Sequence, residues 1–218
     1  MKRKLMTLLI GALCLTSCLS QKLNKESVKV VQNIQHSYEA VVYILNLDRN
    51  SAGTGFHIGN GYFITANHVV ASEVANANKA ILVAGKPAEI LKLDEKLDLA
   101  LLKVDKLNHL KHFKLSSTEP KVYDWVSSLG WHFGRDYAVS IGFVSNVTSY
   151  PDYIFSTSPI NPGCSGGPLV DSNFNVVGVN LMILSVAGGW NGMSIHLRAK
   201  KVKEFIKEYE YDLQDRER

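Results

Sequence analysis

The 218-residue sequence has little net charge and few cysteines, and it lacks a long hydrophobic run. Its 24 basic and 20 acidic side chains give a formal net charge of +4. The first 17 residues hold Lys2, Arg3 and Lys4 and no acidic residue, so their removal would leave a charge of +1. A chain so close to neutral lacks the basic surface that nucleic acids require, and we expect no nucleic-acid binding.

The positions of the three cysteines leave no pair for an internal disulfide. Cys14 lies inside the N-terminal apolar segment and Cys18 directly after it, which leaves Cys164 as the one thiol in the rest of the chain. The fold is therefore expected to be stabilised by its core rather than by cross-links. A hydrophobic content of 46% is enough for one sizeable core or two small ones.

Residues 1–17 are typical of a secretory signal, because a basic start precedes an apolar stretch too short to span a membrane permanently. The sequence LTSC at 15–18 resembles the bacterial lipobox, in which the cysteine is acylated, for example with palmitate, and the preceding peptide is removed. The resemblance implies a lipid-anchored protein of the bacterial cell envelope, facing the periplasm or the exterior. Residues 18–27 would then be the lipidated Cys18 and a tether. The alternative is a soluble secreted protein.

Short apolar segments separated by turn residues predict an all-β fold. The first set of six strands is predicted at 40–47, 53–58, 62–64, 79–84, 89–93 and 99–104. The second set is predicted at 122–130, 137–147, 153–156, 168–170, 176–183 and 192–197. We expect two six-stranded antiparallel barrels, at about 39–104 and 121–197, joined by a polar crossover at 106–120.

Apolar residues at helical spacing predict a short helix at each end of this β region: Val28, Val31, Ile34 and Tyr38, then Val202, Phe205, Ile206 and Tyr209. The first helix could pack on the core or serve subunit contacts. The second carries lysines on its other faces and could lie on a membrane, but interleaved acids favour packing against the protein. Residues 211–218 form a polar tail. His109 and His112 are spaced as metal ligands on one turn, yet no third ligand lies near them in the sequence, and we expect neither metal nor cofactor.

The glycine-rich segment 161–169 surrounds Ser165 and resembles a nucleophile loop. Glycine at 163 would let the amides of Gly163 and Ser165 point into one hollow, where they could stabilise an oxyanion. An activated serine also needs a histidine and a carboxylate. His68 follows a short apolar strand, and Asp98 is embedded in an apolar strand, where an unpartnered acid would be costly.

Three motifs, TANHVV at 65–70, DLALL at 98–102 and GCSGGP at 163–168, together resemble the trypsin-like serine proteases. The segments SAGTGF at 51–56, INPG at 160–163 and GVN at 178–180 resemble the bacterial HtrA (Deg) branch, and the resemblance spans 28–210. There are two departures: Cys164 stands where the family more often has Asn, and Thr65-Ala66-Asn67 varies the usual turn before the histidine. HtrA enzymes usually continue into a PDZ domain, which this chain is expected to lack. Many HtrA enzymes form oligomers, so the resemblance leaves a homo-oligomer as one alternative for this chain.

The resemblance implies a chymotrypsin-like fold and a serine endopeptidase that acts on unfolded or envelope polypeptides through His68, Asp98 and Ser165. The amides of Gly163 and Ser165 would form the oxyanion hole. The positions that resemble the substrate pocket carry no charge, which favours cleavage after aliphatic residues: Pro159, Ile160, Leu181, Met182, Ile183 and Gly192. A cysteine protease using Cys164 does not fit the register of the motif. The alternative function is a catalytically silent, lipid-anchored binding or exclusion protein that keeps the fold.

Overall fold

The computed structural model describes residues 32–33, 35–71, 80–186 and 189–209. The predicted signal, Cys18, the tether, the polar tail and the apolar residues Val28, Val31 and Ile34 lie outside these ranges. Residues 35–40 are helical, and the half-exposed Tyr38 ring lies against the rings of Trp131 and Tyr137, at centroid distances of 6.2 and 5.2 Å.

The first sheet contains all six predicted strands and one more. Its strands are β1 (Val41–Asn46), β2 (Ser51–Gly59), β3 (Tyr62–Thr65), β4 (Ile81–Val83), β5 (Lys86–Pro87), β6 (Glu89–Asp94) and β7 (Leu99–Lys103). They pair in the order β5-β4-β1-β2-β3-β7-β6, as a half-barrel rather than the closed barrel that six strands suggested. The additional strand β5 is only two residues long, and Pro87 has no amide hydrogen with which to extend the pairing.

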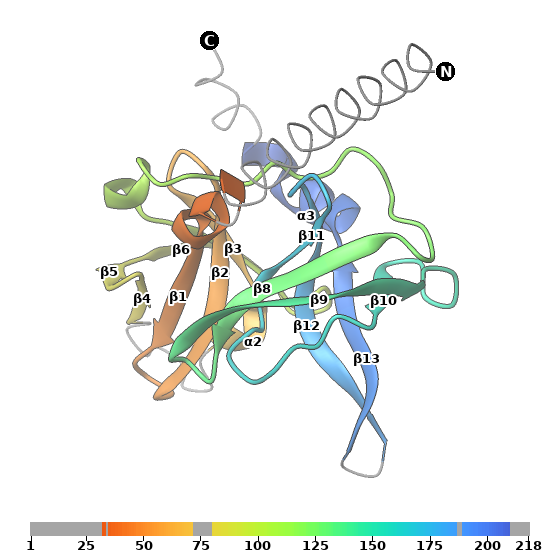
Figure 1. The fold of residues 1–218 in the computed structure, drawn as a ribbon. Coiled ribbons are helices and arrows are strands. Elements are labelled where there is room, and N and C mark those ends of the chain that lie inside the picture. The colour runs from red at the N-terminus through yellow and green to blue at the C-terminus, as the bar shows by residue number, and fades with distance from the viewer. Residues whose placement is uncertain (1–31, 34, 72–79, 187–188, 210–218) are drawn as a thin grey trace, which may run out of the picture. The chain divides into compact units, whose positions relative to one another are not determined.

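The second set forms a closed six-stranded barrel in the order β10-β13-β12-β11-β8-β9. Its strands are β8 (Trp125–His132), β9 (Asp136–Asn146), β10 (Tyr153–Ser156), β11 (Pro168–Asp171), β12 (Val176–Val186) and β13 (Gly189–Arg198). Figure 1 shows β12 and β13 as a long blue hairpin. Inside the barrel, apolar residues such as Ile154 and Leu169 are fully buried, but so are Ser156, Asn180 and His196. The all-β, chymotrypsin-like fold is thus confirmed.

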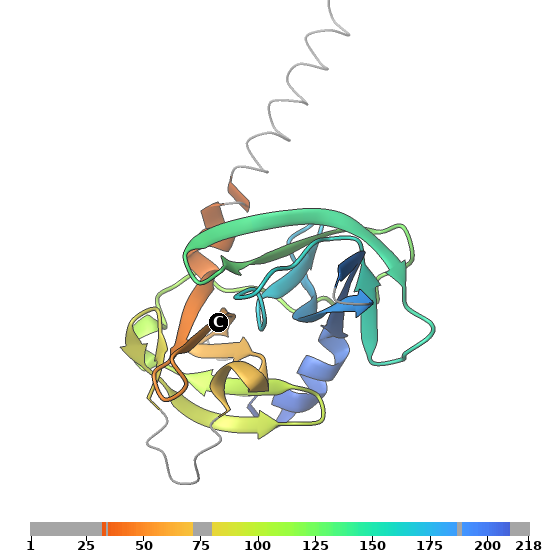
Figure 2. The same ribbon diagram turned by 90° about the horizontal axis from the view of Figure 1, so that it is seen from below.

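The two sheets contact each other where β1 and β2 meet β8. Figure 2, seen from below, places the orange-to-yellow strands of the first sheet beside the green-to-blue strands of the barrel. Short helices complete this unit: α2 (Asn67–Val70), the 3-10 turn Asp105–Leu107, α3 (Ala199–Ile206) and the 3-10 turn Lys207–Tyr209. In α3 the predicted apolar face, including Val202 and Phe205, is buried, which supports packing rather than a membrane surface. Within the described ranges, none of the helices has the length and apolarity needed to span a membrane.

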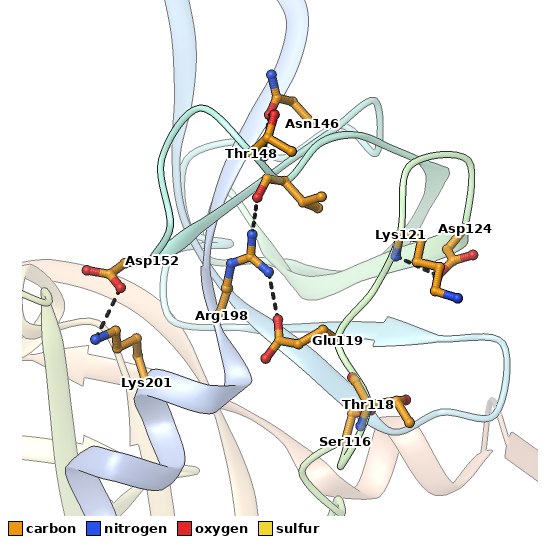
Figure 3. Close-up of polar contacts among 11 residues, drawn as sticks. Ser116, Thr118, Glu119, Lys121, Asp124, Asn146, Thr148, Asp152, Arg198 and Lys201 are labelled. Atoms are coloured by element: carbon orange, nitrogen blue, oxygen red, sulfur yellow. Dashed lines mark hydrogen bonds and ion pairs between the residues drawn. The ribbon is translucent and has the colours of Figure 1, made fainter.

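The crossover at 106–120 is fastened to the barrel by Arg198 (Figure 3). One guanidinium nitrogen of Arg198 donates to Glu119 Oε2 at 2.6 Å, and the other donates to the carbonyl of Val147 in the β9–β10 loop. Lys201 in α3 pairs with Asp152 of the same loop at 3.1 Å. The end of β13 and the start of α3 therefore hold together two segments that are far apart in the sequence.

Candidate active site

His68 and Asp98 come together although 30 residues separate them. His68 lies on α2, just after β3, and Asp98 is the last residue of the turn between β6 and β7. Asp98 Oδ2 lies 2.6 Å from His68 Nδ1, while Oδ1 accepts the His68 backbone N–H at 2.9 Å. The carbonyl of Asp98 also accepts the Asn67 N–H. This arrangement fixes both the backbone and the ring of His68, whose Nε2 is left facing away from the carboxylate.

The expectation that Asp98 is embedded in an apolar strand was wrong in detail. Asp98 precedes β7, and its backbone has a positive φ of 55°. That conformation is uncommon for a residue with a side chain, although Asp tolerates it better than most. The turn points the carboxylate toward α2 instead of into the core, so the acid is partnered and its side chain is 22% exposed.

Ser165 lies in the loop that leads into β11, and this loop is tied to both sheets. The Ser165 carbonyl accepts the Thr54 N–H at 2.9 Å, and the Ser165 Oγ donates to the Leu181 carbonyl at 3.3 Å. A Cβ on Gly166 would lie 2.2 Å from Thr65 Oγ1 and 2.6 Å from the Ala66 nitrogen, so only glycine fits there. The serine loop therefore packs directly against the turn that carries His68.

The backbone at Gly163 has the conformation that the glycine-rich segment suggested. Its φ is 95°, and a Cβ there would lie 2.3 Å from the Trp131 carbonyl. The amides of Cys164, Gly166 and Gly167 donate to backbone carbonyls, whereas the amides of Gly163 and Ser165 donate no hydrogen bond to any residue of the described ranges. Two neighbouring free donors are what an oxyanion site needs.

Thr54 clamps this loop from the side of the first sheet. Its Oγ1 donates to the Gly163 carbonyl at 2.6 Å and accepts the Trp131 N–H at 2.9 Å. The Phe133 N–H donates to the Pro162 carbonyl at 2.7 Å. In the sequence, the segment around Thr54 shows only a resemblance to the HtrA branch. Nothing local in the pattern indicates bonds to partners 77 and 109 residues away.

Cys164 is buried although it is the neighbour of Ser165 in the sequence. Its Sγ lies against Gly130, because a Cβ on that glycine would be 3.2 Å from the sulfur. Burial raises the pKa of the Cys164 thiol to about 11, so the thiol stays protonated at neutral pH. A protonated, buried thiol is not a nucleophile.

The six predicted pocket residues differ in their exposure to solvent. Ile160 and Leu181 are buried, Pro159 and Gly192 are half-buried, and Met182 and Ile183 are exposed on β12. Of the six, only Met182 lines the apolar pocket of about 330 Å³ on the outer face of the barrel, together with Tyr150, Tyr153, Phe155, Leu184 and Ile195. Tyr153 and Phe155 are two residues apart on β10 and so lie on the same face of the strand, and this alternation is the sequence signal that could have indicated the pocket.

His109 and His112 do not form a metal site with the described residues, among which no cluster of three metal-binding side chains occurs. Instead the ring of His112 contacts the buried ring of His57 at 5.9 Å. His57 accepts the Gly61 N–H at Nε2 and faces the carbonyls of Leu110 and Lys111 with Nδ1. Burial lowers the pKa of His57 to about 4, and this histidine attaches the crossover to β2.

Comparisons with known proteins find serine proteases that are similar to this chain. A family model described as trypsin-like peptidase domain matches residues 53–179. The chain is similar to a probable periplasmic serine endoprotease DegP-like of Chlamydia pneumoniae, with 34% identity over 165 residues, covering 71% of this chain and 33% of the relative. A protein of the same description from Pseudomonas putida (strain W619) is 39% identical over 159 residues, covering 67% of this chain and 32% of the relative. The chain thus spans about a third of the length of these curated relatives.

Two solved structures illustrate the likeness in fold. The serine endoprotease from Yersinia pestis has a TM-score of 0.70 at 24% identity, covering 83% of this chain and 66% of the other, which speaks for the fold alone. The HtrA-type protease AlgW with tripeptide has a TM-score of 0.67 at 29% identity, covering 83% and 64%.

Proposed function

The chain belongs to the family of trypsin-like peptidase domains, and from that premise we propose that it hydrolyses peptide bonds with Ser165, His68 and Asp98 as its catalytic residues. The observation that carries the proposal is the 2.6 Å contact between Asp98 Oδ2 and His68 Nδ1, on an element packed against the serine loop. That contact keeps the Nδ1 proton in place and leaves Nε2 as the base.

The proposed reaction follows the general triad mechanism. The Ser165 hydroxyl leaves the Leu181 carbonyl, turns toward His68 and attacks the scissile carbonyl, while Nε2 takes its proton. His68 then returns the proton to the departing amine, and water repeats the sequence to release the acyl group from Ser165. Asp98 holds the ring and stabilises the imidazolium. The free amides of Gly163 and Ser165 receive the oxyanion, a contribution of about 3 kcal/mol per donor.

The experiment that tests this function compares hydrolysis of unfolded casein by the wild type and Ser165→Ala. We expect turnover to fall at least about a thousandfold, because the nucleophile is removed. Ser172→Ala, at an exposed serine just after β11, is the matched control and should keep wild-type turnover. Unchanged turnover in Ser165→Ala would refute the proposal, and an inactive wild type would favour a binding protein that keeps the fold.

We also propose that substrates are cut after small or medium aliphatic residues. The candidate pocket residues Ile160, Leu181 and Ile183 are apolar, and an apolar pocket cannot compensate the desolvation of a substrate Lys or Arg. The curated relatives, described as probable periplasmic serine endoproteases, suggest envelope proteins as the substrate class, and we propose that this chain cuts them when they are unfolded. A peptide-library profile dominated by basic residues before the cut would show that the pocket is elsewhere.

The lipobox-like segment at 15–18 supports the further proposal that Cys18 carries the lipid that holds the protein at the membrane. Cys18→Ala should move the protein from the membrane to the soluble fraction, since acyl chains rather than a spanning helix would anchor it. Failure of labelled palmitate to enter the wild-type protein would contradict this proposal without affecting the catalytic one.

A further inference from the structure

His196 lies in the interior of the second barrel and is not part of the proposed catalytic triad. Its side chain and those of Asn180 and Ser156 are fully buried. His196 Nδ1 lies 2.9 Å from Asn180 Oδ1, and Nε2 lies 2.8 Å from Ser156 Oγ. Burial lowers the pKa of His196 to about 3, so the ring is neutral and carries one proton.

The surrounding hydrogen bonds assign that proton to Nδ1. The side-chain amide nitrogen of Asn180 donates to the Leu129 carbonyl at 3.2 Å, which leaves Asn180 Oδ1 as an acceptor. His196 must then donate from Nδ1, and the Ser156 hydroxyl donates to Nε2. Every polar atom in this chain of bonds has a partner, so each group has one defined orientation.

Asn180 connects this buried chain to the nucleophile loop. The Gly166 N–H donates to the Asn180 carbonyl and the Asn180 N–H donates to the Gly167 carbonyl, both at 2.8 Å. The next residue, Leu181, accepts the Ser165 hydroxyl. The Leu129 carbonyl that Asn180 holds lies against Gly167, where a Cβ would be 2.2 Å away. A shift of Asn180 would therefore move the backbone that directly follows Ser165 and the carbonyl that accepts its hydroxyl.

On its other side His196 bonds to Ser156 of the neighbouring strand β10, after which the chain continues to Ser158. Ser156 Oγ accepts the Ser158 N–H at 3.2 Å, and Ser158 Oγ contacts Ser128 Oγ and the Ser140 carbonyl, both at 2.9 Å. The two bonds of His196 thus differ in what they reach first: the Nδ1 bond reaches the serine loop through Asn180, and the Nε2 bond reaches the segment before Ile160 and, through Ser158, strand β8.

We propose that His196 is a positioning residue for catalysis, which fixes Ser165 in its reactive place through the hydrogen bond to Asn180. The inference rests on the proposed function of Ser165. If the bond is lost, Asn180 can rotate and the loop gains alternative positions. Small displacements of a nucleophile slow the chemical step far more than they weaken substrate binding. The loss should therefore lower kcat and leave KM nearly unchanged.

Two substitutions separate the two bonds. In His196→Asn the side-chain amide replaces Nδ1 and keeps the bond to Asn180, whereas in His196→Gln it replaces Nε2 and keeps the bond to Ser156. Each variant loses one buried hydrogen bond, so both should lower Tm by similar amounts. We expect His196→Asn to keep a kcat close to wild type and His196→Gln to lose about tenfold to a hundredfold. The rate at which a fluorophosphonate probe labels Ser165 should fall in parallel with kcat.

Equal kcat values for the two folded variants, or a change in KM alone, would overturn the proposal and leave His196 as part of a polar core. If His196→Gln does not fold, the partners of His196 can be replaced instead. Asn180→Ala removes the bond at Nδ1, and Ser156→Ala removes the bond at Nε2. The first should then lose kcat and the second should not. Wild-type protein that neither cleaves casein nor reacts with the probe would instead overturn the proposed function itself, and with it this inference.

Discussion

Thr54 shows how one side chain can hold the proposed oxyanion site in shape. It is fully buried and bonds the carbonyl of Gly163 and the amide of Trp131 at the same time. Thr54→Val keeps the shape but leaves both backbone groups unpaired, so we expect a loss of about 1–3 kcal/mol in unfolding free energy. The Gly163 N–H should also no longer point at the oxyanion, and this should lower kcat about tenfold or more.

Thr54→Ser is the matched control, because it keeps the hydroxyl and removes only a methyl group. It should retain most of the activity in casein hydrolysis and most of the stability in urea unfolding. Comparable kcat values for the Val and Ser variants would show that the loop keeps its shape without the clamp.

Cys164 offers a second test at this scale, because expression from residue 19 onward leaves it as the one cysteine of the protein. The thiol is buried, and its pKa is raised to about 11. Since only the thiolate attacks maleimide, and burial keeps the Cys164 thiol protonated, the native protein at pH 8 should react with maleimide far more slowly than the protein unfolded in urea. Rapid labelling of the folded protein, followed by mass spectrometry, would contradict the buried position of this side chain.

The sequence predicts His68, Asp98 and Ser165 as the catalytic residues because the motifs around them are local. It could not identify Thr54 or His196, because their roles depend on strand register. Asn180, for example, faces His196 only because β12 and β13 pair in that register. A buried histidine in an alternating strand has no local signature that separates a core residue from a positioning one.

At the scale of elements, all twelve predicted strands are present, because alternation and turn residues are strong local signals. The closure of the first sheet could not be predicted, since it depends on whether the edge strands β5 and β6 meet, and no local pattern reports that. The polar interior of the second barrel was also not predicted, because the alternation there includes Ser156 and His196 among apolar residues.

Helix α3 is the element whose packing is most easily tested. Phe205 is 5% exposed, and Lys92 of β6 donates from its Nζ to the Phe205 carbonyl at 2.9 Å while lying 5.1 Å from the ring centre. Phe205→Ala should lower the unfolding free energy by about 3–5 kcal/mol, because it leaves a cavity under the helix. Lys200→Ala, at an exposed position on the same helix, should change it by less than about 0.5 kcal/mol. A small effect of Phe205→Ala in urea unfolding would mean that α3 is not docked.

At the scale of the whole molecule, each half buries one neutral histidine that holds distant segments together. His57 attaches the crossover to the first sheet, with His109 and His112 nearby, and His196 joins β12 to β10 inside the barrel. Burial lowers the pKa of His57 to about 4 and that of His196 to about 3, whereas in the unfolded chain both titrate near 6.5. Both halves should therefore lose stability in the same range of pH.

The sign follows from proton uptake. Between pH 6.5 and about 4 the unfolded chain binds protons at both histidines and the native protein does not, so the unfolding free energy falls as the pH falls. With two such groups the steepest slope approaches about 2.7 kcal/mol per pH unit. Urea unfolding at pH 7.5 and pH 5 measures this loss of unfolding free energy. His196→Asn should roughly halve the loss. His109→Gln, at an exposed histidine, is the control and should lose about as much as the wild type. If His196→Asn loses as much stability as the wild type between these pH values, His196 does not remain neutral in the folded protein as the burial of its ring requires.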